Sequence, residues 1–113
     1  MISIPHLMAK TSQTEKGILA LDGEVDLHRS PEIREAIAPF VEQKVPRLLI
    51  DLTKVSYIDS SGLALFIEAL QRVQAYGGTL ALFGLGESVR AIFHIACLDQ
   101  VFRIFPDEAA ASA

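Results

Sequence analysis

Tryptophan is absent from the 113 residues, and cysteine occurs once. A single cysteine excludes an internal disulfide, so the chain is not a disulfide-stabilised secreted domain. Cys97 falls within an apolar helical pattern at Ala91–Leu98, where we expect a buried thiol in the reducing cytoplasm. The histidines are three and scattered. No cluster has the spacing of metal ligands, so we predict no metal site.

The sequence also has no basic run and no long apolar run. Its net charge of −4 makes nucleic acid an unexpected partner. The apolar runs are far shorter than the ~20 residues that cross a bilayer, and Met1–His6 does not resemble a secretory signal. The glycine-containing stretch Gly84–Ser88 has no lysine to hold a phosphate. We therefore expect no membrane association and no cofactor.

The first part of the chain predicts a β-hairpin. Residues 7–14 alternate weakly between apolar and polar side chains, as an edge strand does, and Ile18–Val25 forms a second strand. Between them, Glu15-Lys16-Gly17 is expected to turn, with Gly17 free to adopt a positive φ. Gly23 interrupts the second strand and predicts a bulge or a close backbone approach.

A first helix is predicted after the loop Asp26–Arg29. Ser30 suits the N-cap, and Pro31 suits the first helical position. Pro39 would remove a backbone hydrogen bond inside this helix. We therefore expect a kink or an early end near Ala38.

The rest of the chain alternates strands and helices. We expect a central strand at Arg47–Leu52, followed by a connection at Thr53–Ile58 in which Val55 and Ile58 face the core. A helix at Ser61–Tyr76 is expected to stop at Gly77-Gly78, and a strand follows at Thr79–Phe83. The last elements are a helix with Glu87 in its first turn, which buries Val89, Ile92, Phe93 and Ala96, and a strand at Val101–Phe105. This order predicts an α/β fold with a mixed, mainly parallel sheet and three to four helices packed on it. Half of the residues are hydrophobic, which is enough for one core. We expect a single domain over residues 1–113, with its core at about 5–106 and a flexible tail at 107–113.

Polar residues gather where the connection meets the second helix. Asp59, Ser60 and Ser61 can all be explained as helix-capping residues. We also expect aspartates at or near the ends of strands: Asp22, Asp26, Asp51 and Asp59. Since parallel strands end at one edge of a sheet, Asp26 and Asp59 can converge beside Ser60. Turn and cap chemistry accounts for the same residues, so the pattern alone leaves both interpretations open.

Ser60 does not fit the pattern of a hydrolase nucleophile. A nucleophilic serine on a strand-to-helix turn needs a Gly-x-Ser-x-Gly elbow and a later acid and histidine. Ile58-Asp59 precedes Ser60, and the only later histidine, His94, lies in the apolar pattern of the third helix. We expect His94 to be a core or surface histidine. The sequence thus predicts no catalytic residues and no enzyme.

Two motifs carry a family resemblance. The segment Asp51-Leu52-Thr53-Lys54-Val55-Ser56-Tyr57-Ile58-Asp59-Ser60-Ser61-Gly62-Leu63 resembles the signature of the STAS domain in bacterial anti-sigma-factor antagonists. The segment Gly23-Glu24-Val25-Asp26 resembles the family's other marker. The glycine-rich loop, the third helix and Val101-Phe102 match in order, so the similarity covers about residues 5 to 106. Ala64, where the family commonly has glycine, and Pro39 are departures from the pattern.

The resemblance implies a partner switch. In the family, the serine directly after the acid is phosphorylated by a cognate anti-sigma factor that is itself a serine kinase, and that serine is Ser60 here. The unphosphorylated domain binds the kinase and frees the sigma factor, so that transcription is regulated, and a separate PP2C-type phosphatase resets it. The implied partner-binding residues are Asp26, Asp59, Ser60, Ser61 and Gly62. The small acidic surface suggests a monomer between partners.

Phosphate on Ser60 would act through its charge. It would add about −1.5 to −2 charges at a helix start, which tolerates anions, and beside Asp59. We expect the partner to be repelled without any refolding of the domain.

Other roles remain open for the same fold. The domain could be a non-switching adaptor in a larger assembly such as a lipid-transport complex, with Ser60 only a cap. It could also run the same switch for a process other than transcription, such as secretion. A small hydrolase that uses Ser60 is a third interpretation, from a different class.

Overall fold

Helices alternate with strands along most of the chain in a computed structural model, which describes residues 8–11 and 16–113. The elements in chain order are β1 (Met8–Thr11), β2 (Lys16–Val25), α1 (Ser30–Glu42), β3 (Arg47–Ile58), α2 (Ser60–Ala75), β4 (Thr79–Phe83), α3 (Glu87–Ile95), the 3₁₀ helix η1 (Leu98–Gln100), β5 (Arg103–Phe105) and α4 (Glu108–Ser112). None of the helices in these two ranges is long and apolar enough to span a bilayer.

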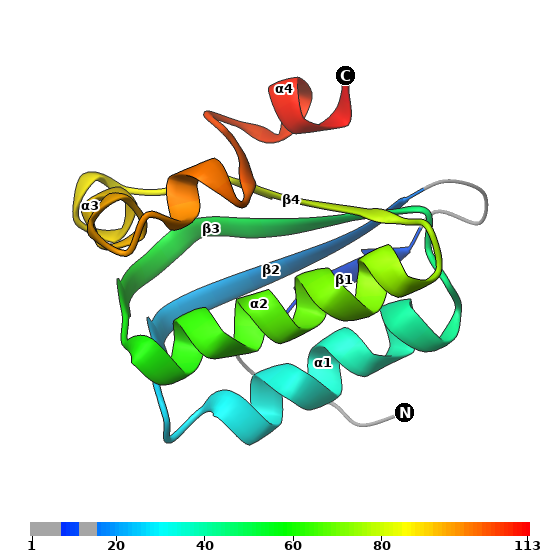
Figure 1. Ribbon diagram of the computed structural model, residues 1–113, viewed down its shortest axis with the longest axis horizontal. Helices are drawn as coiled ribbons and strands as arrows, with labels where there is room; N and C mark the ends of the chain where they lie inside the picture. Colours follow the sequence, from blue (N-terminus) through cyan, green and yellow to red (C-terminus); the bar gives the residue numbers. More distant parts are fainter. Residues whose placement is uncertain (1–7, 12–15) are drawn as a thin grey trace.

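The strands form one sheet in the order β1-β2-β3-β4-β5. β1 pairs antiparallel with β2, and β2 to β5 run parallel. The predicted α/β fold with its mixed, mainly parallel sheet is therefore confirmed, as is the opening hairpin. Figure 1 shows α1 and α2 side by side against one face of the sheet and α4 on the other face. The parallel strands bring their carboxyl ends to the same edge, which is where ligands and partners meet such sheets.

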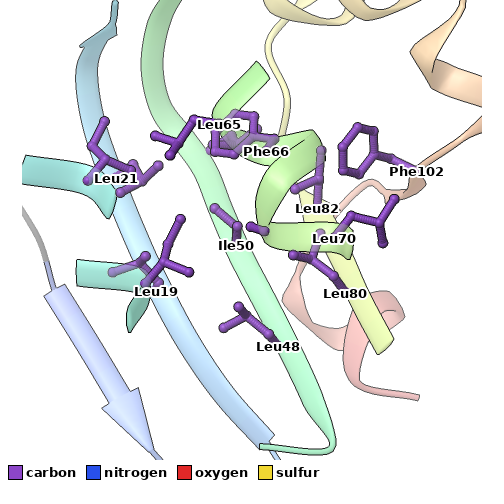
Figure 2. Packing of buried hydrophobic residues seen from close by; sticks show 14 of the residues in the cluster. Leu19, Leu21, Leu48, Ile50, Leu65, Phe66, Leu70, Leu80, Leu82 and Phe102 are labelled. Atoms are coloured by element: carbon purple, nitrogen blue, oxygen red, sulfur yellow. The ribbon is translucent and has the colours of Figure 1, made fainter. Parts of the chain in front are cut away.

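The core lies between the sheet and the helices α1 and α2. Figure 2 shows side chains of three central strands meeting those of α2: Leu19, Leu21, Leu48, Ile50, Leu80 and Leu82 against Leu65, Phe66 and Leu70. Phe66 stacks on Phe93 of α3 with ring centroids 6.4 Å apart, and Phe93 meets Phe102 edge to face at 5.8 Å. Three aromatic rings thus join α2, α3 and the segment after η1.

β3 is longer than the sequence predicts. It continues past Leu52 to Ile58, so the expected connection at Thr53–Ile58 is wrong. Val55 and Ile58 face the core as expected, but the residues between them are exposed and interrupt the alternation. β2 follows this path through two register shifts, the second next to Gly23 at φ +68°. The irregularity predicted at Gly23 is therefore present, but the extra residue at each shift belongs to β3, and the two shifts let both strands end together.

α1 differs from expectation at both of its ends. Arg29, not Ser30, is the N-cap, and the Ser30 hydroxyl instead donates to the Asp26 carbonyl at 3.1 Å. Pro39 does not end the helix, which continues to Glu42. Pro39 is exposed, so the carbonyl that it leaves without a partner can bond to water.

The C-terminal residues, where we expect a flexible tail, include the short helix α4. The Asp107 carboxylate caps α4 by accepting from the Ala110 N–H at 2.9 Å. Ala111 is buried against a second apolar cluster that includes Leu49, Ala81 and Phe83. Arg47 donates to the Ala111 carbonyl at 2.8 Å. A helix this short depends on such contacts with the sheet, which its sequence does not reveal.

Three smaller expectations also fail. Glu15 of the predicted turn lies outside the described residues, and so do residues 7 and 12–14 of the predicted first strand. Gly17 belongs to β2 and does not have the positive φ that the turn would need. A Cβ at Gly17 would lie 2.3 Å from the Phe40 ring, so Gly17 serves packing. Ala96 and Cys97 are exposed because α3 ends at Ile95. The last strand begins at Arg103, after η1, rather than at residue 101.

Replacement of Phe66 by alanine tests the core. Phe66 has no exposed surface and contacts Phe93, so Phe66→Ala should lower the free energy of unfolding by about 3–5 kcal/mol. Ile95 is 81% exposed, so Ile95→Ala should change it by less than about 0.5 kcal/mol. Urea unfolding followed by circular dichroism measures both. Equal effects of the two substitutions would contradict this description of the core.

Candidate functional site

The site lies where β2 and β3 leave the sheet. These parallel strands end opposite each other, with Val25 paired to Ile58. The next residues are therefore Asp26 on one strand and Asp59 on the other. The Asp59 N–H still donates to the Val25 carbonyl, at 3.2 Å, which holds the two exits together.

The Asp59 carboxylate joins two segments of the chain. Its Oδ1 accepts from the Gly62 N–H at 2.9 Å, which caps α2. Its Oδ2 accepts from the Leu27 N–H at 3.1 Å, in the loop between β2 and α1. The capping role considered from the sequence is thus present, but the same side chain also ties the loop to the start of α2.

Hydrogen bonds hold the pKa of the Asp59 carboxyl below its ordinary value of 3.8. The largest effect is that of the Gly62 N–H, while partial burial opposes it and the N–H groups of Leu27 and Ser61 add to it. Asp59 therefore carries its full negative charge at neutral pH, directly beside Ser60.

Ser60 is the first residue of α2 and is exposed. No hydrogen bond to its hydroxyl occurs among the residues that the structure describes. Ser61 is half-buried. The Ser60 hydroxyl is thus accessible to another protein, and the start of a 16-residue helix favours negative charge there.

Gly62 has a packing role in this site. It is buried, and a Cβ in its place would lie 2.4 Å from the Val25 carbonyl oxygen and 2.9 Å from Ile58 Cγ2. Only glycine lets α2 start this close to the end of β2. The expected contact of Gly62 with a partner can therefore only be indirect, through the position of its neighbours.

Asp26 and Asp59 lie at one open hollow, lined also by Leu27 and His28. Asp26 Oδ1 accepts from the Arg29 N–H at 3.1 Å, which closes the loop on itself. The sequence-based expectation that these two aspartates converge beside Ser60 therefore agrees with the geometry.

The other two aspartates lie within strands rather than at their ends. Asp51 is inside β3, where its carboxylate accepts from the Thr53 N–H at 2.9 Å. Asp22 is inside β2 and lies 3.6 Å from the Arg29 guanidinium. Neither belongs to the site, because β3 continues past Asp51 to Ile58 and Asp22 lies three residues before the end of β2.

Two residues of the loop escaped the sequence analysis. Arg29 reaches back to β2 on both sides of Gly23: its Nη1 donates to the carbonyls of Asp22 and of Glu24, the latter at 3.0 Å, and its Nε pairs with Glu32 at 3.2 Å. Leu27 is 71% exposed beside Asp59. The signal in the sequence that could have identified Leu27 is that it is the lone apolar residue in the otherwise polar loop Asp26–Arg29.

His94 does not serve as a catalytic partner of Ser60. That histidine is an exposed residue of α3, and its Nδ1 lies 2.9 Å from Asp99 Oδ2. It is a surface histidine, one of the two expected possibilities. Across residues 8–11 and 16–113, no three His, Cys, Asp or Glu side chains gather as metal ligands do.

The pKa of Asp59 predicts how stability depends on pH. Because folding lowers this pKa, the ionised carboxylate stabilises the fold above about pH 4, and the contribution is lost as the pH falls through the folded pKa. Asp59→Asn should thus be less stable than the wild type at pH 7, and the gap should shrink below about pH 4. Urea midpoints measured from pH 7 to pH 3 give the comparison. A gap that does not change with pH would contradict it.

Replacement of Gly62 tests the close approach of α2 and β2. In Gly62→Ala the new methyl group meets backbone, so the free energy of unfolding should fall by about 2–3 kcal/mol. Gly86 precedes α3 and has open space around it, so Gly86→Ala should stay within about 1 kcal/mol of the wild type. Thermal unfolding of both variants tests this. Full stability of Gly62→Ala would show that the packing is loose.

Comparison with known proteins extends these observations. Residues 7–111 match the STAS domain family. The anti-sigma-B factor antagonist of Bacillus subtilis is 38% identical over 100 residues, which cover 88% of this chain and 91% of that protein. An anti-sigma factor antagonist from Mycobacterium paratuberculosis has the same fold, with a TM-score of 0.83 at 24% identity over 97% of this chain and 95% of that one. The phosphorylated form of the Bacillus cell fate determinant SpoIIAA gives a TM-score of 0.71 at 23% identity, over 94% and 96% of the two chains. Together with the Asp59-Ser60-Ser61-Gly62 junction of β3 and α2, these matches place the chain in the STAS domain family.

Proposed function

We propose that this chain is an anti-sigma factor antagonist whose affinity for its partner is controlled by phosphorylation of Ser60. The observation that carries the proposal is an exposed serine hydroxyl at the start of α2, beside two aspartates, at the exit of two paired strands. The naming of the Bacillus subtilis relative as an anti-sigma-B factor antagonist supports the same function.

The modification is a phosphoryl transfer carried out by the partner. An anti-sigma factor with serine kinase activity supplies ATP, and a bond forms between Ser60 Oγ and the γ-phosphorus as the bond to ADP breaks. The hydroxyl proton leaves to a base on the kinase. A PP2C-type phosphatase removes the group by hydrolysis: water adds to phosphorus, the bond to Ser60 Oγ breaks, and inorganic phosphate leaves as the hydroxyl is restored. The chain itself is substrate and ligand in this scheme, not an enzyme.

The effect of the phosphate is electrostatic and local. It adds about −1.5 to −2 charges next to the ionised Asp59 and near Asp26. The first turn of α2 stabilises an anion, so the domain has no reason to refold. A partner surface that fits a neutral hydroxyl would instead meet repulsion and unpaired phosphate oxygens, which typically costs several kcal/mol.

From this switch we also propose the regulated process, the location of the protein and its contacts with the kinase. The unphosphorylated domain occupies the anti-sigma factor and frees the sigma factor, so the regulated process is transcription. The protein acts as a cytoplasmic monomer between its kinase and its phosphatase. Asp26, Asp59, Ser60 and Ser61 contact the kinase, and Gly62 sets their positions.

Titration of serine variants tests the proposal. The chain is titrated calorimetrically with each purified anti-sigma factor kinase of its source organism. Ser60→Ala should bind like the unphosphorylated wild type, and Ser60→Asp should bind roughly 100 to 1,000 times more weakly, because the added charge lies in the contact. Ser88 is also exposed near a helix start, in α3, so Ser88→Asp is a matched control that should bind normally.

Two outcomes would reject the switch. The first is equal affinity of Ser60→Ala and Ser60→Asp for a kinase that binds the wild type. The second is the absence of phosphate from Ser60, measured by mass spectrometry, after incubation of that complex with ATP. Binding without any phosphorylation would favour the non-switching adaptor.

A further inference from the structure

Among residues 16–113, whose exposure the structure describes, four large apolar side chains are exposed: Leu27 at 71%, Tyr57 at 46%, Ile95 at 81% and Val101 at 52%. Scattered exposed apolar residues are ordinary on a protein surface, so exposure alone identifies nothing. Ile95 and Val101 flank η1, and Tyr57 is in β3. Leu27 differs because it lines the hollow that also contains Asp26 and Asp59.

Hydrogen bonds of three loop residues fix the position of Leu27. Its own N–H donates to Asp59 Oδ2 at 3.1 Å. The residue before it, Asp26, closes the loop by accepting from the Arg29 N–H. Arg29 in turn is held by the carbonyls of Asp22 and Glu24 in β2. An exposed leucine on a loop tied down in this way presents a fixed apolar contact, which is the property of an interface anchor.

The charges around Leu27 indicate what binds there. Asp26 and Asp59 lie beside it, and Glu24 and Glu32 belong to the segments on either side. Arg29, the arginine of this loop, already pairs with Glu32 and Asp22, while His28 lines the hollow with the two aspartates. A complementary surface therefore has an apolar pocket with a rim of lysine or arginine.

We propose that Leu27 is the apolar anchor that the anti-sigma factor kinase buries when it binds, in a pocket with a basic rim beside its active site. Asp59 is the positioning residue, since its carboxylate holds the Leu27 backbone. This inference rests on the proposed function of Ser60 and adds to it a residue that decides which partner fits. Phosphorylation places its charge next to the same anchor.

Truncation of Leu27 is the first test. The probe is the purified kinase that phosphorylates the wild-type chain. Leu27→Ala should bind it about 10 to 100 times more weakly, as truncation of a buried anchor does, with unchanged thermal stability because the side chain is exposed. Ile95→Ala removes an equally exposed side chain outside the hollow and should bind normally. If Leu27→Ala binds as tightly as the wild type while Ser60→Asp does not, the anchor is rejected and the switch stands. If no kinase binds the wild type, the proposed function fails instead.

A double-mutant cycle tests the part assigned to Asp59. An asparagine can keep the bond from Gly62 through its oxygen, but its NH₂ group cannot accept from Leu27. In Asp59→Asn, hydrogen exchange at the Leu27 amide should therefore accelerate while exchange at the Gly62 amide stays slow. The effect of Leu27→Ala on affinity should fall to about threefold or less in the Asp59→Asn background. Strictly additive effects of the two substitutions would overturn the positioning role.

Discussion

The carboxylate of Asp59 connects the two halves of the site. One of its oxygens accepts from Gly62 in the first turn of α2 and the other from Leu27 in the loop before α1. Both segments leave the sheet at paired positions of β2 and β3, so a side chain as short as aspartate can reach each of them. The surface that carries Ser60 is therefore one unit, although its parts are more than 30 residues apart in the sequence.

The residues around Asp59 mainly maintain the geometry of the site. Gly62 allows α2 to start against the Val25 carbonyl, and Gly23 takes a positive φ next to a register shift that lets β2 end level with β3. Arg29 donates to the β2 carbonyls on both sides of Gly23. These three residues build the frame, on which the Ser60 and Leu27 side chains are exposed.

The sequence was sufficient for the architecture because apolar periodicity determines it. The alternation of strands and helices predicts the parallel sheet, and the sheet in turn predicts that Asp26 and Asp59 meet. Prediction failed where tertiary contacts decide the structure. Residues 53–58 form a strand because they pair with Asp22–Val25 of β2 through two register shifts, and α4 forms because Ala111 fits against Leu49 and Phe83. Cys97 and Leu27 look apolar in sequence, and only the end of α3 and the course of the loop place them at the surface.

The hydrogen bonds of Asp59 also bear on the thermodynamics of recognition. A loop that wanders in the free protein must lose conformational entropy when it is captured, and that loss weakens the complex. Here the loop is already immobilised by the capping group of the adjacent helix. On this side of a complex, little conformational entropy then remains to be lost. A surface that is preorganised in this way can be engaged and released repeatedly without the protein having to fold anew.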